Sequence, residues 1–199
     1  VNTVEKLYPE LSPNLSTCMS PHMMLGSVIK THWAELMKID PSNIYHVSLM
    51  PCTAKKDEIL RKQFDHVLPA GMRPIDAVIT TREFAQMLKS INVTNWAAVP
   101  EMVYDNPFGI SSGSGVIFGT TGGVMEAALR TAYELHTNKD LPKVDFKACR
   151  GLQGLEQAEV DMGDVKLRIA VVHGTRSVRT LLERIKNKDP EYNFHFVEV

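Results

Sequence analysis

The chain contains the stretch Met50-Pro51-Cys52-Thr53-Ala54-Lys55-Lys56-Asp57-Glu58 directly after the strand-like run 44–49, Ile-Tyr-His-Val-Ser-Leu. That run predicts a β-strand, and the proline that follows ends it because proline has no backbone N–H to give to a neighbouring strand. Cys52 therefore comes just past a strand end, where α/β proteins tend to bind their ligands. If the next residues are helical, Cys52, Lys55 and Glu58 share one face of the helix. We then expect a thiol, an ammonium and a carboxylate to meet in one place.

The same stretch has a simpler interpretation. Free cysteine is among the most buried residue types and usually packs as a small apolar group. Under this alternative Cys52 is a core residue, while Lys55 and Glu58 belong to a solvated turn. The residues of the stretch alone leave both interpretations open.

Predicted strands and helices alternate along the rest of the chain. Ser20-Pro21 is typical of a helix start, and the apolar spacing after it predicts a helix to about Met37. A hairpin is predicted between 158–162 and 166–173 through Gly163-Asp164. The alternation favours an α/β fold with mixed, largely parallel sheets flanked by helices. The other expected elements are strands at 44–49, 76–80, 146–150 and 195–199 and helices at 1–11, 82–90, 122–136 and 175–187.

A second unusual region is rich in glycine, with six glycines between 109 and 123. It lacks the Lys-Ser/Thr ending of a phosphate-binding loop, and Phe118 stands where a dinucleotide motif needs glycine. Nucleotide binding is therefore disfavoured, and the glycines instead permit close approach of a buried group or of another chain segment. The helix opened by Gly122-Gly123 either points its positive end at an anionic ligand or simply packs against a sheet. The irregular stretch 97–109 before this region is a candidate boundary between two lobes.

Composition excludes several classes of protein. Of the 199 residues 44% are hydrophobic and 23% charged, with a net charge of −1, so the chain has no basic footprint for nucleic acid and no apolar run of membrane-spanning length. Its three cysteines are far apart, which opposes a disulfide framework or a self-contained zinc site and suits a reducing compartment. We expect Cys18 and Cys149 to be buried, neutral thiols.

The stretch 50–58 resembles the second cysteine signature of the iron-only (FeFe) hydrogenases, Met-Pro-Cys-x-x-Lys-x-x-Glu. A second match is Ser112-Gly-Ser-Gly-Val-Ile-Phe-Gly-Thr-Thr-Gly-Gly-Val-Met-Glu-Ala-Ala-Leu-Arg130, and a third is 13–18 followed by Ser20-Pro21. Arg150-Gly151 and 169–174 also fall in family order. The resemblance runs nearly from end to end. It implies that 1–199 is part of the catalytic domain of the large subunit, with two lobes around a cofactor cleft and a lobe boundary near 97–110.

The resemblance also implies a cofactor, the H-cluster, which is a 4Fe-4S cubane bridged by cysteine to a diiron unit that bears carbon monoxide and cyanide. By resemblance Cys52 is a cubane ligand, Lys55 donates to a cyanide, and Ser16 supplies a hydroxyl of the proton route. Glu58 is near enough in sequence to orient Lys55, which is an inference from spacing. The residues that match the pocket lining are Ser20, Pro21, Met50, Pro51, Phe118 and Gly119.

His22 departs from the family, whose members often have glutamine there. We expect a neutral imidazole that donates or accepts a hydrogen bond near the pocket, since the positive end of a helix disfavours its protonation. The alternative is a surface or packing histidine.

A four-iron cluster is usually held by four thiolates, and this chain offers only Cys52 by motif. By resemblance, the first and third cysteine motifs lie outside 1–199, so we expect the fragment alone to be inactive. The complete protein would oxidise dihydrogen reversibly and use accessory iron–sulfur clusters, with ferredoxin or NADH-linked subunits as electron partners and maturation proteins for assembly. The resemblance favours the cytoplasm of an anaerobic bacterium and leaves periplasmic and organellar locations open.

Two other function classes remain beside this one. A non-catalytic relative would keep the fold and an iron–sulfur site for cluster assembly or sensing, and a metal-free interaction module applies to the isolated fragment alone. Lys55 and the Ser20-Pro21 pair favour catalysis, because a simple electron-transfer cluster needs neither of them.

Overall fold

The computed structural model describes residues 1–199 except 70, 142, 145–146 and 149–152. It divides into two compact units. The first, Ser16–Gly109, is called the Cys52 unit; the second joins Val1–Leu15 to Ile110–Val199 and is called the hairpin unit. The break at Gly109 falls in the irregular stretch before the glycine-rich region, whereas the break after Leu15 has no signal in the sequence. That the two units are lobes of one catalytic domain stays a prediction.

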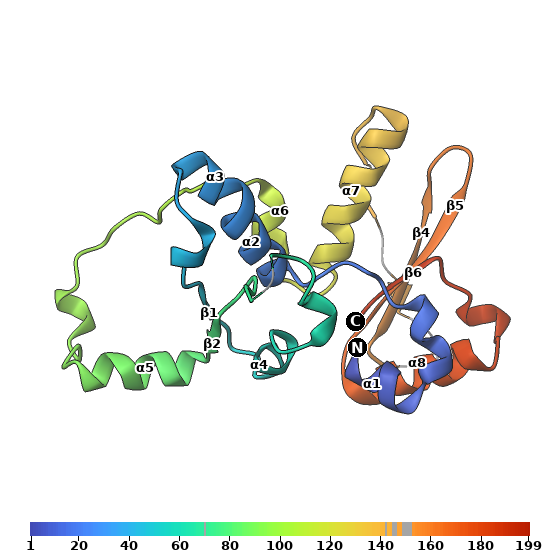
Figure 1. Cartoon of the computed structure of the whole chain (residues 1–199). Helices are drawn as coiled ribbons and strands as arrows, with labels where there is room; N and C mark the ends of the chain where they lie inside the picture. The colour runs from blue at the N-terminus through green and yellow to red at the C-terminus, as the bar shows by residue number, and fades with distance from the viewer. Residues whose placement is uncertain (70, 142, 145–146, 149–152) are drawn as a thin grey trace. The chain divides into compact units, whose positions relative to one another are not determined.

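The Cys52 unit is built on a small parallel sheet, β1 (Val47–Leu49) paired with β2 (Ala77–Ile79) (Figure 1). Its longest helical segment begins at Pro21 and ends at Met37. Helix α2 (Pro21–Val28) leads through a π-helical turn (Ile29–Trp33) into α3 (Ala34–Met37). Helix α4 (Ala54–Glu58) follows β1 and α5 (Thr81–Ser90) follows β2, and short 3-10 helices lie at Pro41–Asn43, Lys62–Phe64 and Trp96–Ala98.

An apolar cluster and a buried ion pair hold this unit together. Met23, Ile59, Ile75 and Val78 form the buried cluster, which joins α2 to β2 and to the end of α4. Beside it, the buried Lys30 places Nζ 2.6 Å from Asp76 Oδ2, and the same oxygen accepts the backbone N–H of His46 at 2.6 Å. Asp76 and His46 are the residues that immediately precede β2 and β1. The Asp76 carboxylate therefore links the starts of both strands to Lys30 of the π-helical turn.

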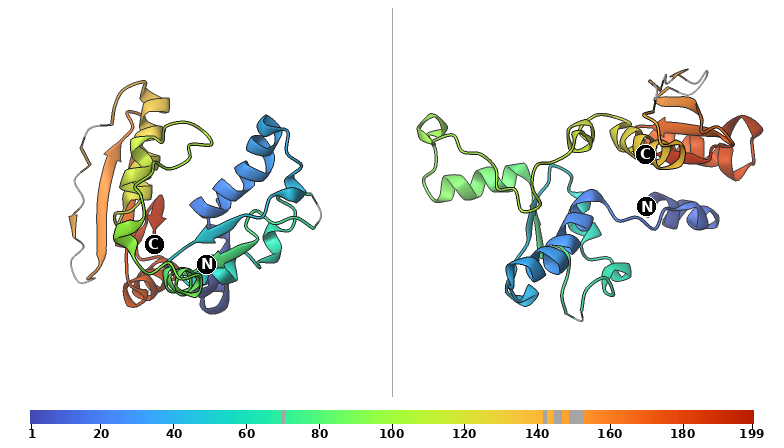
Figure 2. Two further views of the ribbon diagram at one scale, coloured as in Figure 1. Left: turned by 90° about the vertical axis from the view of Figure 1, so that its left-hand side faces the viewer. Right: turned by 90° about the horizontal axis from the view of Figure 1, so that it is seen from above.

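The hairpin unit contains a four-stranded sheet in the order β3-β4-β5-β6. Strands β4 (Leu155–Asp161) and β5 (Lys166–Val172) form an antiparallel hairpin, β3 (Lys147–Ala148) adds antiparallel to β4, and β6 (Phe196–Glu198) adds parallel to β5. Helix α7 (Gly123–Thr137) runs beside the hairpin, as Figure 2 shows in a second view. The other helices are α1 (Asn2–Leu7), α6 (Gly113–Ile117) and α8 (Thr175–Lys186), with 3-10 turns at Pro9–Asn14 and Pro190–Tyr192.

The second half of strand β5, residues 169–172, is a continuous apolar run because both of its faces are covered. Its residues alternate between two buried clusters: Ile169 and Val171 pack with α7, whereas Ala170 and Val172 pack with Leu181 of α8. Successive side chains of a strand point to opposite faces, so a strand covered by a helix on each face needs apolar residues at every position. The sheet is tied to α7 once more by Glu198, whose Oε2 accepts the N–H of Met125 at 2.6 Å.

The predicted α/β fold with mixed sheets flanked by helices is confirmed. Parallel pairing occurs at β1–β2 and at β5–β6, and the hairpin supplies antiparallel pairs. The expected helix 1–11 is α-helical only to Leu7, because Pro9 opens a 3-10 turn. The hairpin begins at Leu155, three residues before the predicted start. Most of the predicted strand 146–150 lies outside the described residues.

Within the part of the chain that the structure describes, none of the helices has the length and apolar character needed to cross a membrane.

Candidate cofactor site

Cys52 lies in the turn between β1 and α4. The N–H of Met50 donates to the carbonyl of Ile79 at 2.9 Å and so extends the pairing of β1 with β2 by one residue. Pro51 ends that pairing, and the carbonyl of Cys52 accepts the N–H of Lys55 at 3.2 Å, just before the helix. The predicted order of strand, turn and helix is therefore confirmed. Cys52 is an exposed free thiol, so the alternative in which it is a core residue is wrong.

The carboxylate of Glu58 lies at the centre of a group of polar side chains. Its Oε2 is 2.8 Å from Lys55 Nζ and 3.1 Å from His22 Nε2. Since an ionised carboxylate only accepts hydrogen bonds, His22 Nε2 must carry the hydrogen. The other ring nitrogen, Nδ1, is 3.0 Å from Ser48 Oγ. Helix α2, strand β1 and helix α4 thus each contribute to one hydrogen-bonded group.

His22 is 7% exposed, so it is not the surface histidine of one alternative. Ser48, which the sequence analysis missed, is 5% exposed and is the inward-facing residue of β1. The signal was present: a serine that alternates with Val47 and Leu49 in a short strand points to the other face of the sheet. A polar residue on a buried face needs a partner, and His22 is that partner.

Opposing effects act on the pKa of Glu58. Burial works to raise the pKa, but hydrogen bonds from Lys55, from Ser20 and from His22, together with the positive charge of Lys55, hold it below the ordinary value. The contribution of Ser20 comes from proximity rather than from a well-formed bond, because its buried Oγ makes no hydrogen bond of ordinary geometry. Ser20 occupies the N-cap position of α2, as predicted, but its side chain does not cap the helix.

The lowered pKa of Glu58 predicts an acid-dependent loss of stability. A depressed folded-state pKa means that the ionised group stabilises the fold above its unfolded-state pKa, near 4.5, and that this contribution is lost as the pH falls through the folded-state value. We expect Glu58→Gln in the cofactor-free full-length protein to flatten the fall in unfolding free energy between about pH 6 and about pH 3. Denaturant titrations at each pH measure this. Glu35→Gln, at an exposed position of α3, is the control. If the unfolding free energy of Glu58→Gln falls with decreasing pH as steeply as that of the unmodified protein, the prediction is contradicted.

The other predicted site residues of the Cys52 unit lie as follows. Met50 packs against the buried apolar cluster, and Pro21 is the exposed first residue of α2. Ser16 is exposed, and its Oγ accepts the N–H of Cys18 at 3.1 Å. The prediction that Cys18 is buried is wrong: the thiol is exposed, because the segment between Leu15 and Ser20 forms no regular element that covers it. The predicted burial of Cys149 lies outside the described residues.

Phe118 and Gly119 belong to the hairpin unit, between α6 and α7. Phe118 is 41% exposed, and among the described residues only the carbonyl oxygen of Val116, 3.7 Å away, lies within 4 Å of the position that a Cβ on Gly119 would take. Within the hairpin unit, Phe118 is therefore partly exposed and the space beside Gly119 is unfilled by described residues. Their predicted place in the lining of a pocket with Cys52 stays a prediction.

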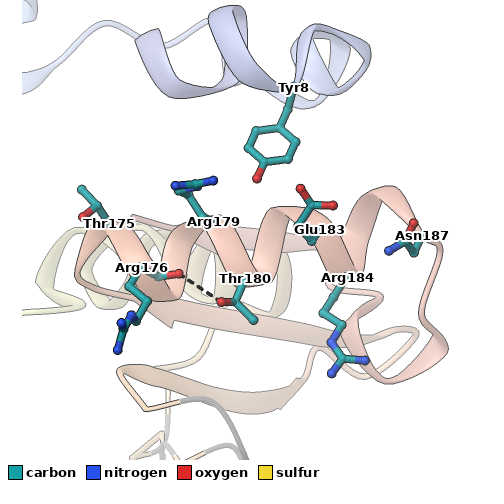
Figure 3. A pocket seen from close by; sticks show the side chains of 8 residues that line it. All are labelled: Tyr8, Thr175, Arg176, Arg179, Thr180, Glu183, Arg184 and Asn187. Atoms are coloured by element: carbon teal, nitrogen blue, oxygen red, sulfur yellow. Dashed lines mark hydrogen bonds between the residues drawn. The ribbon is translucent and has the colours of Figure 1, made fainter.

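The hairpin unit also has a polar groove of about 530 Å³ between Tyr8 and α8 (Figure 3). The ring of Tyr8 points toward the helix, on the side where Arg179 and Glu183 lie. Nearby, Lys186 pairs with Glu10 at 2.7 Å. The residues that line it include no cysteine, so this groove offers no thiolate to an iron–sulfur cluster. It is lined by Tyr8, Thr175, Arg176, Arg179, Thr180, Glu183, Arg184 and Asn187.

The residues around Cys52 fit part of an iron–sulfur site. Among the described residues no group of three or more His, Cys, Asp or Glu side chains is arranged to hold a metal ion. Cys52 is an exposed free thiol, and the buried Ser20 Oγ has no hydrogen-bond partner among the residues that the structure describes. One thiolate is a quarter of the usual ligand set of a four-iron cluster. The chain therefore fits such a group as the source of one ligand and of neighbouring polar contacts.

A family model described as "Iron only hydrogenase large subunit, C-terminal domain" matches residues 1–199, the whole chain. The chain belongs to this family. The predicted resemblance to the FeFe hydrogenases is thereby confirmed, and with it the association with the H-cluster domain.

Similar proteins include the periplasmic Fe hydrogenase large subunit of Nitratidesulfovibrio vulgaris, 47% identical over 195 residues, which are 98% of this chain and 45% of the relative. The NADP-reducing hydrogenase subunit HndD of Solidesulfovibrio fructosivorans is 43% identical over 199 residues, 100% of this chain and 33% of the relative. Among solved structures, an apo FeFe-hydrogenase HydA1 variant from Chlamydomonas reinhardtii superposes with a TM-score of 0.79 at 37% identity, covering 98% of this chain and 55% of that one. The chain thus spans less than half the length of these two curated relatives.

A more distant relative bears on the alternative function. A probable cytosolic Fe-S cluster assembly factor of Anopheles gambiae is 28% identical over 186 residues, 92% of this chain and 39% of the relative. The hydrogenases are closer to this chain in sequence.

Proposed function

We propose that this FeFe-hydrogenase domain holds one side of an H-cluster and serves the reversible oxidation of dihydrogen to protons and electrons. The observation that carries the proposal is the turn after β1, where an exposed free cysteine is followed within one helical turn by a lysine whose ammonium is 2.8 Å from Glu58. Membership of the iron-only hydrogenase family supports it.

In this proposal Cys52 is a thiolate ligand of the cubane, and Lys55 donates a charge-assisted hydrogen bond to an anionic cyanide. Glu58 keeps the ammonium oriented, and Ser20, Pro21, Met50 and Pro51 line the pocket. When bound, the cofactor supplies the centre at which dihydrogen is cleaved, and the protein supplies binding, orientation and protection from water. Ser16 is proposed as a hydroxyl of the proton route, and Phe118 and Gly119 as further lining residues.

The partners are proposed by analogy with the relatives. The NADP-reducing relative supports an electron partner that is linked to a nicotinamide cofactor, with ferredoxin as the other candidate. Accessory iron–sulfur clusters and maturation proteins belong to the same proposal. The periplasmic relative makes the periplasm a candidate location beside the cytoplasm.

A non-catalytic role in cluster assembly is the second candidate, and the likeness to a probable assembly factor favours it. The two candidates differ in whether carbon monoxide and cyanide are bound to iron. Infrared spectra of the matured full-length protein separate them: the catalytic proposal requires stretching bands of both ligands. A protein that carries iron and sulfide but shows no such bands supports the assembly role instead.

The ligand count predicts how the isolated chain behaves. A four-iron cluster usually needs four thiolates, and only Cys52 occupies a ligand position, so residues 1–199 alone should not hold a stable cluster. We expect anaerobic reconstitution followed by desalting to leave far less than stoichiometric iron, with no cubane absorption. The full-length protein, treated in parallel, is the positive control. Stoichiometric iron with a cubane spectrum in the fragment would show that the missing cysteine motifs are not required.

A further inference from the structure

Four side chains of the Cys52 unit form one line of hydrogen bonds, from Ser48 through His22 and Glu58 to Lys55. Exposure rises along this line: Ser48 is 5% exposed, and the side chains of His22, Glu58 and Lys55 are 5%, 17% and 29% exposed. The inner end is therefore fixed by the core. The outer end, Lys55, is three residues from Cys52 and donates its backbone N–H to the carbonyl of that cysteine.

The pair of Glu58 and Lys55 would be weak by itself. A lysine and a glutamate three residues apart on a short, partly exposed helix attract each other only weakly, and the gain is smaller than the rotamer entropy that the lysine loses. Helix α4 has five residues, so its own backbone gives little rigidity. A second, independent contact that restrains the Glu58 carboxylate is needed to keep the Lys55 ammonium in one position.

His22 provides that contact. Its Nε2 donates to the same Glu58 oxygen that Lys55 contacts, at 3.1 Å, and its ring is fixed by burial and by Ser48 at Nδ1. The bond also joins α2 to α4 across 36 residues of sequence. Hydrogen bonds to a charged group are stronger than neutral ones, so this part-buried contact is a second restraint on the Glu58 carboxylate that does not depend on helix α4.

We infer that His22 is a positioning residue: it fixes the carboxylate of Glu58, and Glu58 in turn fixes the ammonium of Lys55. Both ring nitrogens of His22 are engaged by Glu58 and Ser48, so this inference replaces the expectation that His22 binds the cofactor directly with a role through Glu58. The inference rests on the proposed function in one respect, the purpose of Lys55, which is to meet an anionic ligand of the cofactor.

Two amide substitutions separate the two contacts of His22. The amide nitrogen of glutamine is as many bonds from Cα as Nε2 is, so His22→Gln keeps a donor for Glu58. Asparagine ends where Nδ1 does, so His22→Asn keeps a partner for Ser48 but does not reach Glu58. Both variants replace the ring by a neutral amide, and each is the matched control of the other. Ser48→Ala is a third variant that loosens the ring and leaves its bond to Glu58.

The first readout needs no cofactor. In the cofactor-free full-length protein, the rate at which an amine-acetylating reagent modifies Lys55 reports how firmly its ammonium is held, and Lys56, which bonds to Glu83 and to the carbonyl of Val78, is an internal standard. We expect the Lys55 rate relative to Lys56 to rise about fivefold in His22→Asn, as the loss of one hydrogen bond allows. It should stay near the original in His22→Gln and rise less in Ser48→Ala. Equal rates in the two amide variants, with both folded by melting, overturn the inference.

The second readout uses the cofactor-loaded protein. If Lys55 donates to cyanide, releasing it in His22→Asn shifts a cyanide stretching band, while His22→Gln leaves the band in place. Unshifted bands in His22→Asn together with raised Lys55 labelling would uphold the role of His22 and remove the cyanide contact from the proposal. If the unmodified protein shows no carbon monoxide and cyanide bands, the proposed function is wrong. The Lys55 labelling rates would still decide the role of His22.

Discussion

Replacing Cys52 with alanine in the full-length protein should abolish the four-iron cluster and with it hydrogen evolution. Mutating the outer-shell partners of a metal ligand costs about 10- to 100-fold in metal affinity or activity, so losing a ligand itself should cost more than about 100-fold. The exposed position of Cys52 means that the substitution leaves no cavity in the core, and the fold of the Cys52 unit should persist. Iron analysis, visible absorption and hydrogen evolution measure the outcome.

Cys18→Ala is the matched control for this experiment. Cys18 is also an exposed free cysteine of the same unit, but it does not occupy a ligand position of the family signature. We expect its variant to keep the iron content and activity of the unmodified protein. If both variants lose iron alike, a general effect of removing a thiol explains the loss. If Cys52→Ala keeps a cubane, Cys52 is not a ligand.

Lys55→Ala should separate the two parts of the cofactor. The cubane depends on thiolates and should remain, whereas the diiron unit or its activity should be lost because the ammonium no longer meets cyanide. Lys56→Ala is the matched control, since Lys56 is the next residue and its ammonium pairs with Glu83 at 2.8 Å. Normal hydrogen evolution by Lys55→Ala would remove Lys55 from the active site.

The turn around Cys52 was predictable from sequence because its determinants are local. A strand-like run, a proline without a backbone donor and three spaced residues, Cys52, Lys55 and Glu58, specify strand, turn and helix within a few positions. The hairpin of β4 and β5 and the helix α7 at Gly123–Thr137 were predictable for the same reason. These elements depend on neighbouring residues, and short-range patterns describe them well.

The group around Glu58 was not predictable in the same way. His22 meets Ser48 across 26 residues and Glu58 across 36, and no periodicity in the sequence links positions so far apart. The burial of Cys18 was predicted wrongly for a related reason. Burial depends on what other elements cover a residue, and residue type alone gives only a tendency.

The glycines of 112–123 have two different physical reasons, which a pair of alanine substitutions distinguishes. A Cβ on Gly123 would clash with the carbonyl oxygen of Ile117 and lie 2.6 Å from its carbon, so the backbone between α6 and α7 would have to move. In the part of the chain that the structure describes, a Cβ on Gly119 would meet nothing closer than 3.7 Å, and the φ of Gly119 lies outside the left-handed region. Gly123 therefore leaves room for the backbone of the chain itself. That the open space at Gly119 is left for another group is the proposal that the two substitutions test.

We expect Gly123→Ala to lower the unfolding free energy of the cofactor-free full-length protein by about 3 kcal/mol or more, as severe overpacking against backbone does. Gly119→Ala should change it by less than about 0.5 kcal/mol, because an open glycine at ordinary φ gains from the reduced entropy of the unfolded chain. Denaturant unfolding of both variants tests this. Because Phe118 and Gly119 are proposed to line the cofactor pocket, Gly119→Ala should nevertheless load the cofactor poorly. A Gly119→Ala protein that loads and turns over normally but unfolds early would show that this glycine is structural, and the proposed lining would have to be withdrawn.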